Sequence, residues 1–510
     1  MFDHLIRGFT PLIEWHNILA IVAGSVVGYI VGALPGLSAT MGIALLLPFT
    51  FHLEPLTSLI LLTSLYGAAE YGGSITAVTL NIPGEAAATP TCFDGYPLTK
   101  KGLPAKALGM SIVASAYAGI LSTVALIFTS VPLARFAISF GPPEYFALGI
   151  FGLTTVASLS GKSWLKGFMG VLFGLLINTI GLDAISGTKR YAFAVDLFEG
   201  IPLVPLLIGL FAISEVLVTM EELTQENVVY QKISGSLPTL KEYWNAHTAM
   251  VRGTIIGYVI GIIPGAGKAV ASFIAYNEEK RASKHPELFG TGVLEGVAAP
   301  EAANNSVVSG ALVPLLSLGI PGSAAAAVLI GAFTIHGLQP GPMLFAKEPG
   351  LIYGLFASLL VGNMVMLAMG LLGTQLWAKV LRVPKNILTP IVLAITLFAA
   401  YAESNSLFSV WLALIFGIIG YILRKYDFPV APIVLAMVLG KMIEISFRRS
   451  LILSEGSLSI FLLRPIPVAM FMLTALSVGF QFYRTWKKRG AIGSKDSKIR
   501  KGEKDDEAND

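Results

Sequence analysis

The segment GSVVGYIVGALPG, at residues 24–36, is an apolar helix pattern that stops at a Pro-Gly pair. The same pattern returns at residues 253–265 as GTIIGYVIGIIPG and again stops at Pro-Gly. The two segments align without a gap, and each matched pair is 229 positions apart. Proline removes a backbone donor and glycine permits a sharp departure from the helix, so each segment predicts a broken helix. The chain is therefore expected to hold two copies of one structural unit.

A second pair of breaks extends the repeat. The sequence IPGEAAA at residues 82–88 corresponds to IPGSAAA at residues 320–326, with a shift of 238 positions. The second half therefore gains about nine residues between its two breaks. One Pro-Gly kink could be relieved by neighbouring helices, but two matching pairs favour a functional role. Broken helices at corresponding positions of two halves are the best sequence pointer to a transporter binding site.

The composition is that of a membrane protein. Of 510 residues, 54% are hydrophobic and only 13% are charged, whereas soluble domains carry about 25% charged residues. Apolar runs near 20 residues recur, and each is long enough to cross the hydrocarbon core. The runs do not alternate between apolar and polar residues as the strands of an outer-membrane barrel do. We expect contact with the lipid bilayer and no nucleic-acid partner.

The predicted fold is an all-α polytopic membrane protein with about 10–12 spans in two repeats. Broken helices or re-entrant hairpins lie at mid-membrane in this prediction. The expected divisions are an interfacial N-terminal segment at 1–16, repeat one at 17–220, a cytoplasmic connecting loop at 221–248, repeat two at 249–464, an additional C-terminal span at 465–484 and a disordered, charged cytoplasmic tail at 485–510.

The basic loops indicate that the two repeats are inverted. Lysine and arginine collect in cytoplasmic loops, which places the loop at residues 379–385 in the cytoplasm. Counting spans places the corresponding first-half loop, at Arg135, outside. Equivalent loops then lie on opposite sides of the membrane, an arrangement compatible with an elevator-like mechanism. Arg135, Arg448 and Arg449 would be positive charges on the outer side, against the general rule.

The four breaks are the expected solute site, because irregular backbone inside a membrane persists only within protein or along a wet cavity. Helix N-termini there would present N–H groups to carboxylates, each contact worth about 0.3–2 kcal/mol. Small residues at the breaks could instead serve close helix packing, which is the role expected of the glycines before each first break. The candidate solute-binding residues are Pro35, Gly36, Ser38, Thr40, Pro83, Gly84, Pro264, Gly265, Gly267, Lys268, Pro321, Gly322 and Ser323.

Lys268 follows the third break by three residues. A lysine at the centre of a membrane costs about 2.5–3.5 kcal/mol on insertion scales. Two interpretations remain open: the side chain reaches the interface, or it is a countercharge for a solute carboxylate.

Polar residues before the second break of each half predict a coupling site for a small cation, either Na⁺ or a proton. Carboxylate, amide and hydroxyl oxygens suit such an ion, although interhelical hydrogen bonds would use the same groups. The candidates are Glu70, Asn81, Glu301, Asn304, Asn305 and Ser306. Glu85 and Asp94, which follow the second break, are expected near a surface.

No cofactor, metal-ligand cluster or enzyme signature is expected. One cysteine excludes an intramolecular disulfide. The sequence GIIPGAGKAVAS resembles a phosphate loop only in part, because its spacing departs from GxxxxGK[ST] and Ala269 follows the lysine. Energy must then come from an ion gradient.

At these residues the chain resembles the large membrane subunit of the tripartite tricarboxylate transporters. Four blocks carry the resemblance: GALPGLSATMGIALLLPFTF (32–51), YGAAEYGGSITAVTLNIPGEAAATPTCFDGYP (66–97), GIIPGAGKAVASFIAYNEEKR (261–281) and PEAANNSVVSGALVPLLSLGIPGSAAAAVLIGAF (300–333). The resemblance extends over nearly the whole chain, without the N-terminal segment and the tail.

The resemblance implies a multi-pass symporter of the bacterial inner membrane that imports citrate or related organic carboxylates. It implies two protein partners: a small membrane subunit of about four spans and a periplasmic solute-binding protein. It also carries the transport role onto the matched motifs around Pro35-Gly36, Pro264-Gly265, Asn304-Asn305 and Pro321-Gly322. Both a monomer and a homodimer are compatible with the sequence.

Two other classes of function are weighed against this one. A stand-alone secondary carboxylate transporter or a channel could carry the same paired breaks, and saturable transport with counterflow would argue against the channel. An intramembrane enzyme could use Glu70 or Glu301 as acid or base, but no catalytic pair is identified.

Overall fold

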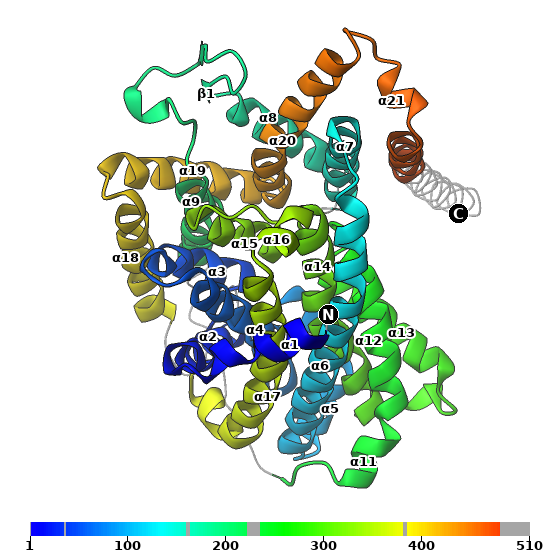
Figure 1. The fold of residues 1–510 in the computed structure, drawn as a ribbon. Helices are drawn as coiled ribbons and strands as arrows, with labels where there is room; N and C mark the ends of the chain where they lie inside the picture. Colours follow the sequence, from blue (N-terminus) through cyan, green and yellow to red (C-terminus); the bar gives the residue numbers. More distant parts are fainter. Residues whose placement is uncertain (1, 35–36, 160–163, 222–234, 381–384, 480–510) are drawn as a thin grey trace, which may run out of the picture.

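Helices make up nearly all of the structure, which is a computed structural model (Figure 1). It describes residues 2–34, 37–159, 164–221, 235–380 and 385–479. The first-half α-helices are α1 (Phe2–Gly8), α2 (Trp15–Ala33), α3 (Ala39–Leu46), α4 (Pro55–Leu80), α5 (Thr89–Lys100), α6 (Pro104–Ala137), α7 (Pro142–Leu159), α8 (Trp164–Asn178), α9 (Leu203–Leu207) and α10 (Ser214–Glu221). The later ones are α11 (Leu240–Asn245), α12 (His247–Ile262), α13 (Lys268–Ala282), α14 (Leu294–Leu318), α15 (Ala324–Ile335), α16 (Pro342–Lys347), α17 (Pro349–Val380), α18 (Lys385–Ser404), α19 (Leu407–Lys425), α20 (Ala431–Leu453) and α21 (Ile460–Leu463).

Short elements complete the chain. The 3₁₀ turns are η1 (Thr10–Ile13), η2 (Leu47–His52), η3 (Ala86–Ala88), η4 (Val195–Leu197) and η6 (Pro286–Leu288). A π-helical segment, η5 (Ile208–Ile213), joins α9 to α10. Two short strands, β1 (Gly181–Leu182) and β2 (Lys189–Arg190), form an antiparallel pair.

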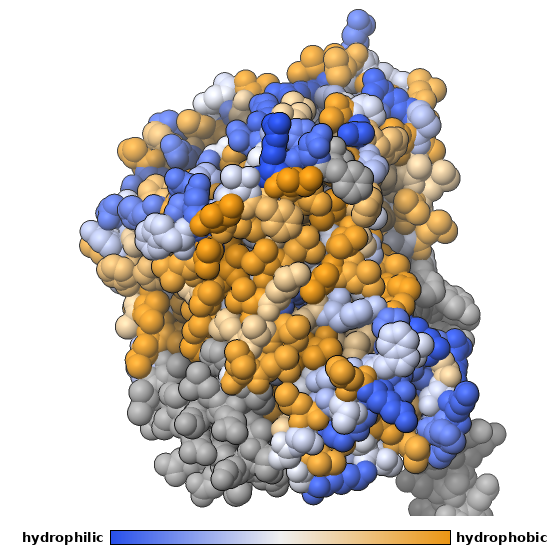
Figure 2. Space-filling model, turned by 60° about the horizontal axis from the view of Figure 1, so that its bottom comes forward, coloured by the Kyte–Doolittle hydropathy of each residue, from blue (hydrophilic) through white to orange (hydrophobic). Residues whose placement is uncertain are grey.

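The surface and the helix lengths fit a bilayer. Five helical segments in the described residues are long and apolar enough to span a membrane: Trp15–Ala33, Pro104–Ala137, Leu203–Glu221, Pro349–Gly373 and Leu407–Lys425. Figure 2 shows a broad apolar band across the middle of the molecule, with hydrophilic residues gathered above and below it. The prediction of an all-α polytopic membrane protein is confirmed, while the figure of 10–12 spans and the domain boundaries stay predictions.

The two-fold repeat is a repeat of packing as well as of sequence. In each half the helix that ends at the first break lies along the helix before the second break, α2 on α4 and α12 on α14. A Cβ on any of three glycines in each first helix would lie under 3.0 Å from a carbonyl oxygen of the second. The facing residues are Gly24 and Leu61, Gly28 and Leu65, Gly32 and Ala69, Gly253 and Ala299, Gly257 and Ala303, and Gly261 and Val307.

These contacts reproduce both shifts found in the sequence. The glycines of the two halves are 229 positions apart and their partners are 238 positions apart. The absence of side chains lets each pair of backbones approach closely, which is the role expected for small residues between membrane helices.

The middle of the molecule is built around α14. It packs against α12 and α13 of its own half and against α4, α5 and α6 of the first half, while α17 packs against α4 and α6 (Figure 1). A second group, formed by α7, α8 and α20, lies at the top of Figure 1 next to the strand pair. The central position of α14 brings residues of both halves to one place.

Ion pairs neutralise arginines near the second group of helices. Arg448 lies 2.6 Å from Asp183, and Arg190 lies 2.7 Å from Glu444. Arg448 is one of the positive charges that contradicted the inverted arrangement. Acidic residues contribute little to the rule that places lysine and arginine in the cytoplasm, so the ion pair leaves this objection in place. The inverted orientation itself stays a prediction.

Candidate functional site

The second break of each half is held by the helix before it. The N–H of Gly84 donates to the carbonyl oxygen of Gly73 at 3.0 Å, and the N–H of Gly322 donates to that of Ala311 at 3.4 Å. These two bonds are again 238 positions apart at both ends. A Cβ at either break glycine would lie under 3.0 Å from backbone atoms. Gly84 and Gly322 are therefore required for close packing, with Pro83 half-buried and Pro321 buried beside them.

Within each half, the two breaks are joined by a hydrogen bond. The N–H of Gly265 donates to the carbonyl oxygen of Gly322 at 3.1 Å, which ties the third break to the fourth. The N–H of Ala39 donates to Glu85 Oε1 at 2.6 Å, which ties the chain after the first break to the second. Pro264 is buried and Gly265 has φ 77°, so the chain leaves α12 in a left-handed turn. Pro35 and Gly36 lie outside the described residues.

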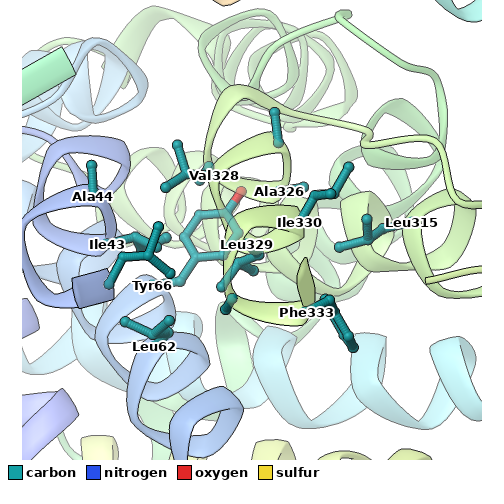
Figure 3. Close-up of a cluster of buried hydrophobic side chains, with 14 of the residues drawn as sticks. Ile43, Ala44, Leu62, Tyr66, Leu315, Ala326, Val328, Leu329, Ile330 and Phe333 are labelled. Atoms are coloured by element: carbon teal, nitrogen blue, oxygen red, sulfur yellow. The ribbon is translucent and has the colours of Figure 1, made fainter. Parts of the chain in front are cut away.

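Tyr66 links the two halves on the apolar side of the breaks. Its ring lies among the side chains of α3 and α15, including Ile43, Val328 and Leu329 (Figure 3). Its hydroxyl lies 3.0 Å from Ser323 Oγ. A buried phenol usually needs such a partner, so the cluster fixes the tyrosine and the start of α15 together.

The helix N-termini at the breaks differ in how they are capped. Ser38 caps α3 by accepting from the N–H of Met41, and Ser323 caps α15 by accepting from the N–H of Ala326. Thr40 lies half-buried in the first turn of α3. The N-cap of α13 is Gly267, which has φ 82°, is exposed and has no side chain to offer. Of these three ends, α13 is the one whose N–H groups have no side-chain cap and can turn to a ligand.

Lys268 is the first residue of α13 and forms a charged cluster with the first half. Its Nζ lies 2.6 Å from Glu70 Oε1 on α4 and also contacts Glu85 Oε2 in the segment after the second break. The carboxylates of Glu70 and Glu85 are 0% and 3% exposed, whereas the lysine side chain is 25% exposed. We call Glu70, Glu85 and Lys268 the break triad. Lys268 is thus placed at the junction of the two halves.

Two acceptor atoms beside the triad have no partner in the described part of the chain. Glu70 Oε2 and Asn304 Oδ1 are buried and accept no hydrogen bond from any residue that the structure describes. Asn304 lies next to Glu70, because its Nδ2 donates to the carbonyl oxygen of Glu70 at 3.1 Å. Buried polar atoms are almost always hydrogen-bonded, so each of these two oxygens is suited to a donor or a cation.

Glu301, in contrast, is saturated with hydrogen bonds. Four hydroxyl groups from α4, α5 and α6 donate to its two carboxylate oxygens. They belong to Ser74 at 2.6 Å, Thr91, Ser111 at 2.8 Å and Ser115 at 3.3 Å. The side chain is 0% exposed. Hydrogen bonds of this number stabilise a buried charge, and they join α14 to three first-half helices.

The other candidates of the cation group are dispersed. Asn305 lines a small cavity between α4, α6, α14 and α17, where its buried Nδ2 has no partner among the described residues. Ser306 Oγ donates to the carbonyl oxygen of Ala303 within α14, at the contact with Gly257. Asn81 is exposed and ends α4 with φ 59°. The structure therefore brings together Glu70 and Asn304, with Lys268, and separates Asn81 from them.

The expectation that Glu85 and Asp94 lie near a surface is wrong. As whole residues, Glu85 is 6% exposed and Asp94 is 0% exposed. Asp94 accepts from the hydroxyl of Tyr276 and from the N–H groups of Gly290, Gly292 and Val293, at 2.8–3.1 Å. Sequence reasoning missed their burial because their partners are distant in the sequence: those of Asp94 and the lysine that pairs with Glu85 lie about 180–200 positions away.

No group of three or more His, Cys, Asp or Glu side chains in the described residues could hold a metal ion. The oxygen-rich places that remain are the break triad with Asn304 and the cage around Glu301. Oxygen donors of this kind suit hard cations or protons rather than the soft metals that thiolates bind. The arrangement therefore combines an open helix N-terminus with a lysine, which suits an anion, and a neighbouring acidic group, which suits a cation.

Comparison with known proteins gives two kinds of match. The family model of the tripartite tricarboxylate transporter TctA family matches residues 18–435. An uncharacterized 52.8 kDa protein in the TAR-I ttuC' 3' region of Agrobacterium vitis is 36% identical over 471 residues, which cover 92% of this chain and 94% of that protein. An uncharacterized protein in the TAR-II ttuC' 3' region of the same organism is 37% identical over 222 residues, 44% of this chain and 92% of that protein. No solved structure matches this chain.

Proposed function

Because this chain belongs to the TctA family of tripartite tricarboxylate transporters, we propose that it imports an organic carboxylate across the bacterial inner membrane by symport with a cation. The family is one of transporters, and a tripartite system includes other subunits. In the proposal these are a small membrane subunit of about four spans and a periplasmic solute-binding protein. The gradient of Na⁺ or H⁺ supplies the energy, and no other cofactor takes part.

The start of α13 is the proposed solute site. The observation that carries this proposal is the combination of an uncapped helix N-terminus with Lys268, the partly exposed member of a cluster that is otherwise buried. N–H groups and an ammonium both favour carboxylates. The N-termini of α3 and α15 serve this role less well, because Ser38 and Ser323 cap them. The solute would therefore approach the third break, near the junction with the fourth.

The coupling site is proposed to lie on the opposite side of Lys268 from the solute. The buried carboxylate of Glu70 and the amide of Asn304 supply oxygen atoms there. An ionisable residue inside a membrane protein is a functional candidate by default. Placing a cation beside an anion site lowers the free energy of holding a multiply charged solute away from water.

The proposed movement is elevator-like and uses the repeat. The pairs α2–α4 and α12–α14 are each closely packed along a glycine face, which supports their moving as units. The breaks of the two halves meet between these pairs. A movement of one group of helices against another could then expose the same site first to one side and then to the other. The inverted orientation of the repeats is part of this proposal.

Reconstitution tests the proposed function. The full chain, with its small membrane partner, is placed in proteoliposomes, and uptake of radiolabelled citrate is followed with and without the binding protein. We expect saturable uptake that requires an inward Na⁺ or H⁺ gradient and shows counterflow. Uptake that is unchanged when both gradients are collapsed would contradict the proposal.

A pair of matched variants tests the solute site in the same assay. Lys268→Met is expected to lose uptake. Arg252→Met is the matched control, because it also removes a cation that pairs with a glutamate, Glu279 on α13, at 2.8 Å. Arg252 lies away from the breaks, so this variant should retain uptake. Full activity of Lys268→Met would contradict the assigned site.

A further inference from the structure

We propose that Lys268 is an exchangeable countercharge that couples the solute to a sodium ion. In the absence of solute its ammonium neutralises Glu70. A solute carboxylate at the start of α13 draws the ammonium away from Glu70, and Na⁺ takes its place against Glu70 and Asn304. This inference rests on the proposed function and adds to it the way in which the two ligands depend on each other.

With both carboxylates ionised, the charge of the break triad favours a further cation, either a proton or a metal ion. Two carboxylates and one ammonium leave a net charge of −1 in a place where the carboxylates are 0% and 3% exposed. In the described residues no other lysine, arginine or histidine lies within ion-pair distance of Glu70 or Glu85. Unpaired buried charge is strongly unfavourable. The cluster therefore attracts a cation, and it attracts one more strongly when Lys268 moves away.

Glu85 and Glu70 differ in how well they tolerate that movement. Glu85 keeps the N–H of Ala39 as a donor to its Oε1, at the N-terminus of α3. Glu70 has no such donor, since Lys268 is its one side-chain partner in the described residues and its Oε2 has none. Glu70 is therefore the carboxylate that needs a replacement cation when the ammonium leaves.

The exposure of Lys268 and Glu70 decides which of them the solute can reach. Lys268 is 25% exposed and stands at the open N-terminus of α13, so a solute can reach it. Glu70 is fully buried, so a bulky anion cannot approach it. Lys268 is the member of the triad that contacts both the open N-terminus of α13 and the buried carboxylate of Glu70. An exchange of partners requires such a residue.

Oxygen atoms are already in place for sodium. Glu70 contributes Oε1, once the ammonium has left it, and Oε2, while Asn304 contributes Oδ1. A hard cation prefers carboxylate and amide oxygens. The bond from Asn304 Nδ2 to the carbonyl oxygen of Glu70 fixes the amide so that its oxygen faces away from that carbonyl. The same bond ties α14 to α4 at this point.

The coupling between solute binding and Na⁺ binding is reciprocal. If the solute raises the affinity for Na⁺ by some factor, Na⁺ must raise the affinity for the solute by the same factor, typically about 5- to 150-fold. Glu301 has no part in this exchange, because four hydroxyl groups occupy its oxygens.

Sodium binding to purified variants tests the exchange without any solute. Binding of ²²Na⁺ to the full-length protein in detergent is measured by scintillation proximity for the wild type, Lys268→Met, Lys268→Arg and Arg252→Met. Removal of the competing ammonium should tighten Na⁺ binding of Lys268→Met by about tenfold or more, within the usual range of coupling. Lys268→Arg and Arg252→Met should bind Na⁺ as the wild type does.

The double variant Glu70→Gln with Lys268→Met should lose the tight binding. Tight binding that survives in this double variant overturns the proposal, and so does a Lys268→Met protein that binds Na⁺ no more tightly than the wild type. If Lys268→Met is not monodisperse on size exclusion, Lys268→Ala replaces it, since it also leaves Glu70 without a competing donor, and the same two outcomes decide.

A parallel uptake assay separates this inference from the proposed function. Gradient-dependent citrate uptake by the wild type, together with unchanged Na⁺ affinity in Lys268→Met, overturns the exchange alone. Uptake that needs no gradient of either cation overturns the proposed function, whatever the Na⁺ affinities are.

Discussion

Substituting one glycine on each helix of the α2–α4 pair tests the packing that defines the repeat. A Cβ at Gly32 would overlap the backbone of Ala69, including its carbonyl oxygen, whereas a Cβ at Gly67, in the middle of α4, would meet nothing within 4 Å. The obstacle at Gly32 is backbone, which cannot rotate away as a side chain can. Gly32→Ala therefore requires α2 and α4 to separate.

The size of the effect follows from two opposing terms. Overpacking in a well-packed interior costs about 1–3 kcal/mol, and a backbone obstacle favours the upper end, about 3 kcal/mol. Alanine in place of a helical glycine contributes about 1 kcal/mol in the other direction. Gly67→Ala gains the helix propensity of alanine without the overpacking cost. The free energy of unfolding should therefore differ by about 3 kcal/mol between the two variants, since the helix-propensity term cancels.

Thermal unfolding of the detergent-solubilised protein measures this difference. Gly32→Ala should melt well below the wild type, and Gly67→Ala should melt at or above it. Gly261→Ala, at the equivalent position on α12, should behave as Gly32→Ala does. Stability rather than transport is the readout, because Gly67 borders the cavity that Asn305 lines. Equal melting temperatures for Gly32→Ala and Gly67→Ala would refute the reasoning.

Three further predictions concern buried or bridging carboxylates. Glu301→Ala should lower the free energy of unfolding by about 3–5 kcal/mol, and Glu301→Gln by less, because four hydroxyl groups lose their acceptor; thermal melting that matches the wild type would contradict this. Asp94→Ala should speed hydrogen exchange at Gly290, Gly292 and Val293, whose N–H groups donate to Asp94, whereas Asp94→Asn keeps an oxygen there and should change exchange little. Hydrogen bonds from Lys106 and from the backbone lower the pKa of Glu242 to about 2. A lowered pKa stabilises the fold above about pH 4.5, and this contribution is lost as the pH falls to about 2; the drop in melting temperature from about pH 6 to about pH 3 should be smaller in Glu242→Gln, and an equal drop would contradict the assignment.

The repeat could be predicted from the sequence because its physical cause is local. A helix that must pack closely shows glycines at a spacing of four, and a helix that must break shows Pro-Gly. Once the contacts across α2–α4 are known, the shifts of 229 and 238 positions give those across α12–α14. Each of these signals lies within about a dozen residues of one segment.

The site could be predicted only in part, because its contacts join distant segments. Lys268 was recognised as unusual from its membrane position, but its partners Glu70 and Glu85 belong to the other half. The burial of Glu85 could not be inferred, since a charge after a Pro-Gly break is equally compatible with a loop at the surface. The hydroxyl cage of Glu301 comes from three helices and leaves no spacing pattern in the sequence.

The internal repeat has a consequence for stoichiometry. A duplicated unit creates two equivalent sites, of which the break triad occupies one. The repeat shifts give the residues at the equivalent positions of the other site: Ala39 for Lys268, Ser323 for Glu85 and Val308 for Glu70. All three counterparts are uncharged, and Gly267, the open cap of α13, corresponds to the capping Ser38. Divergence after duplication has thus left charged residues at one of the two equivalent sites and uncharged residues at the other. We expect one solute per chain rather than two.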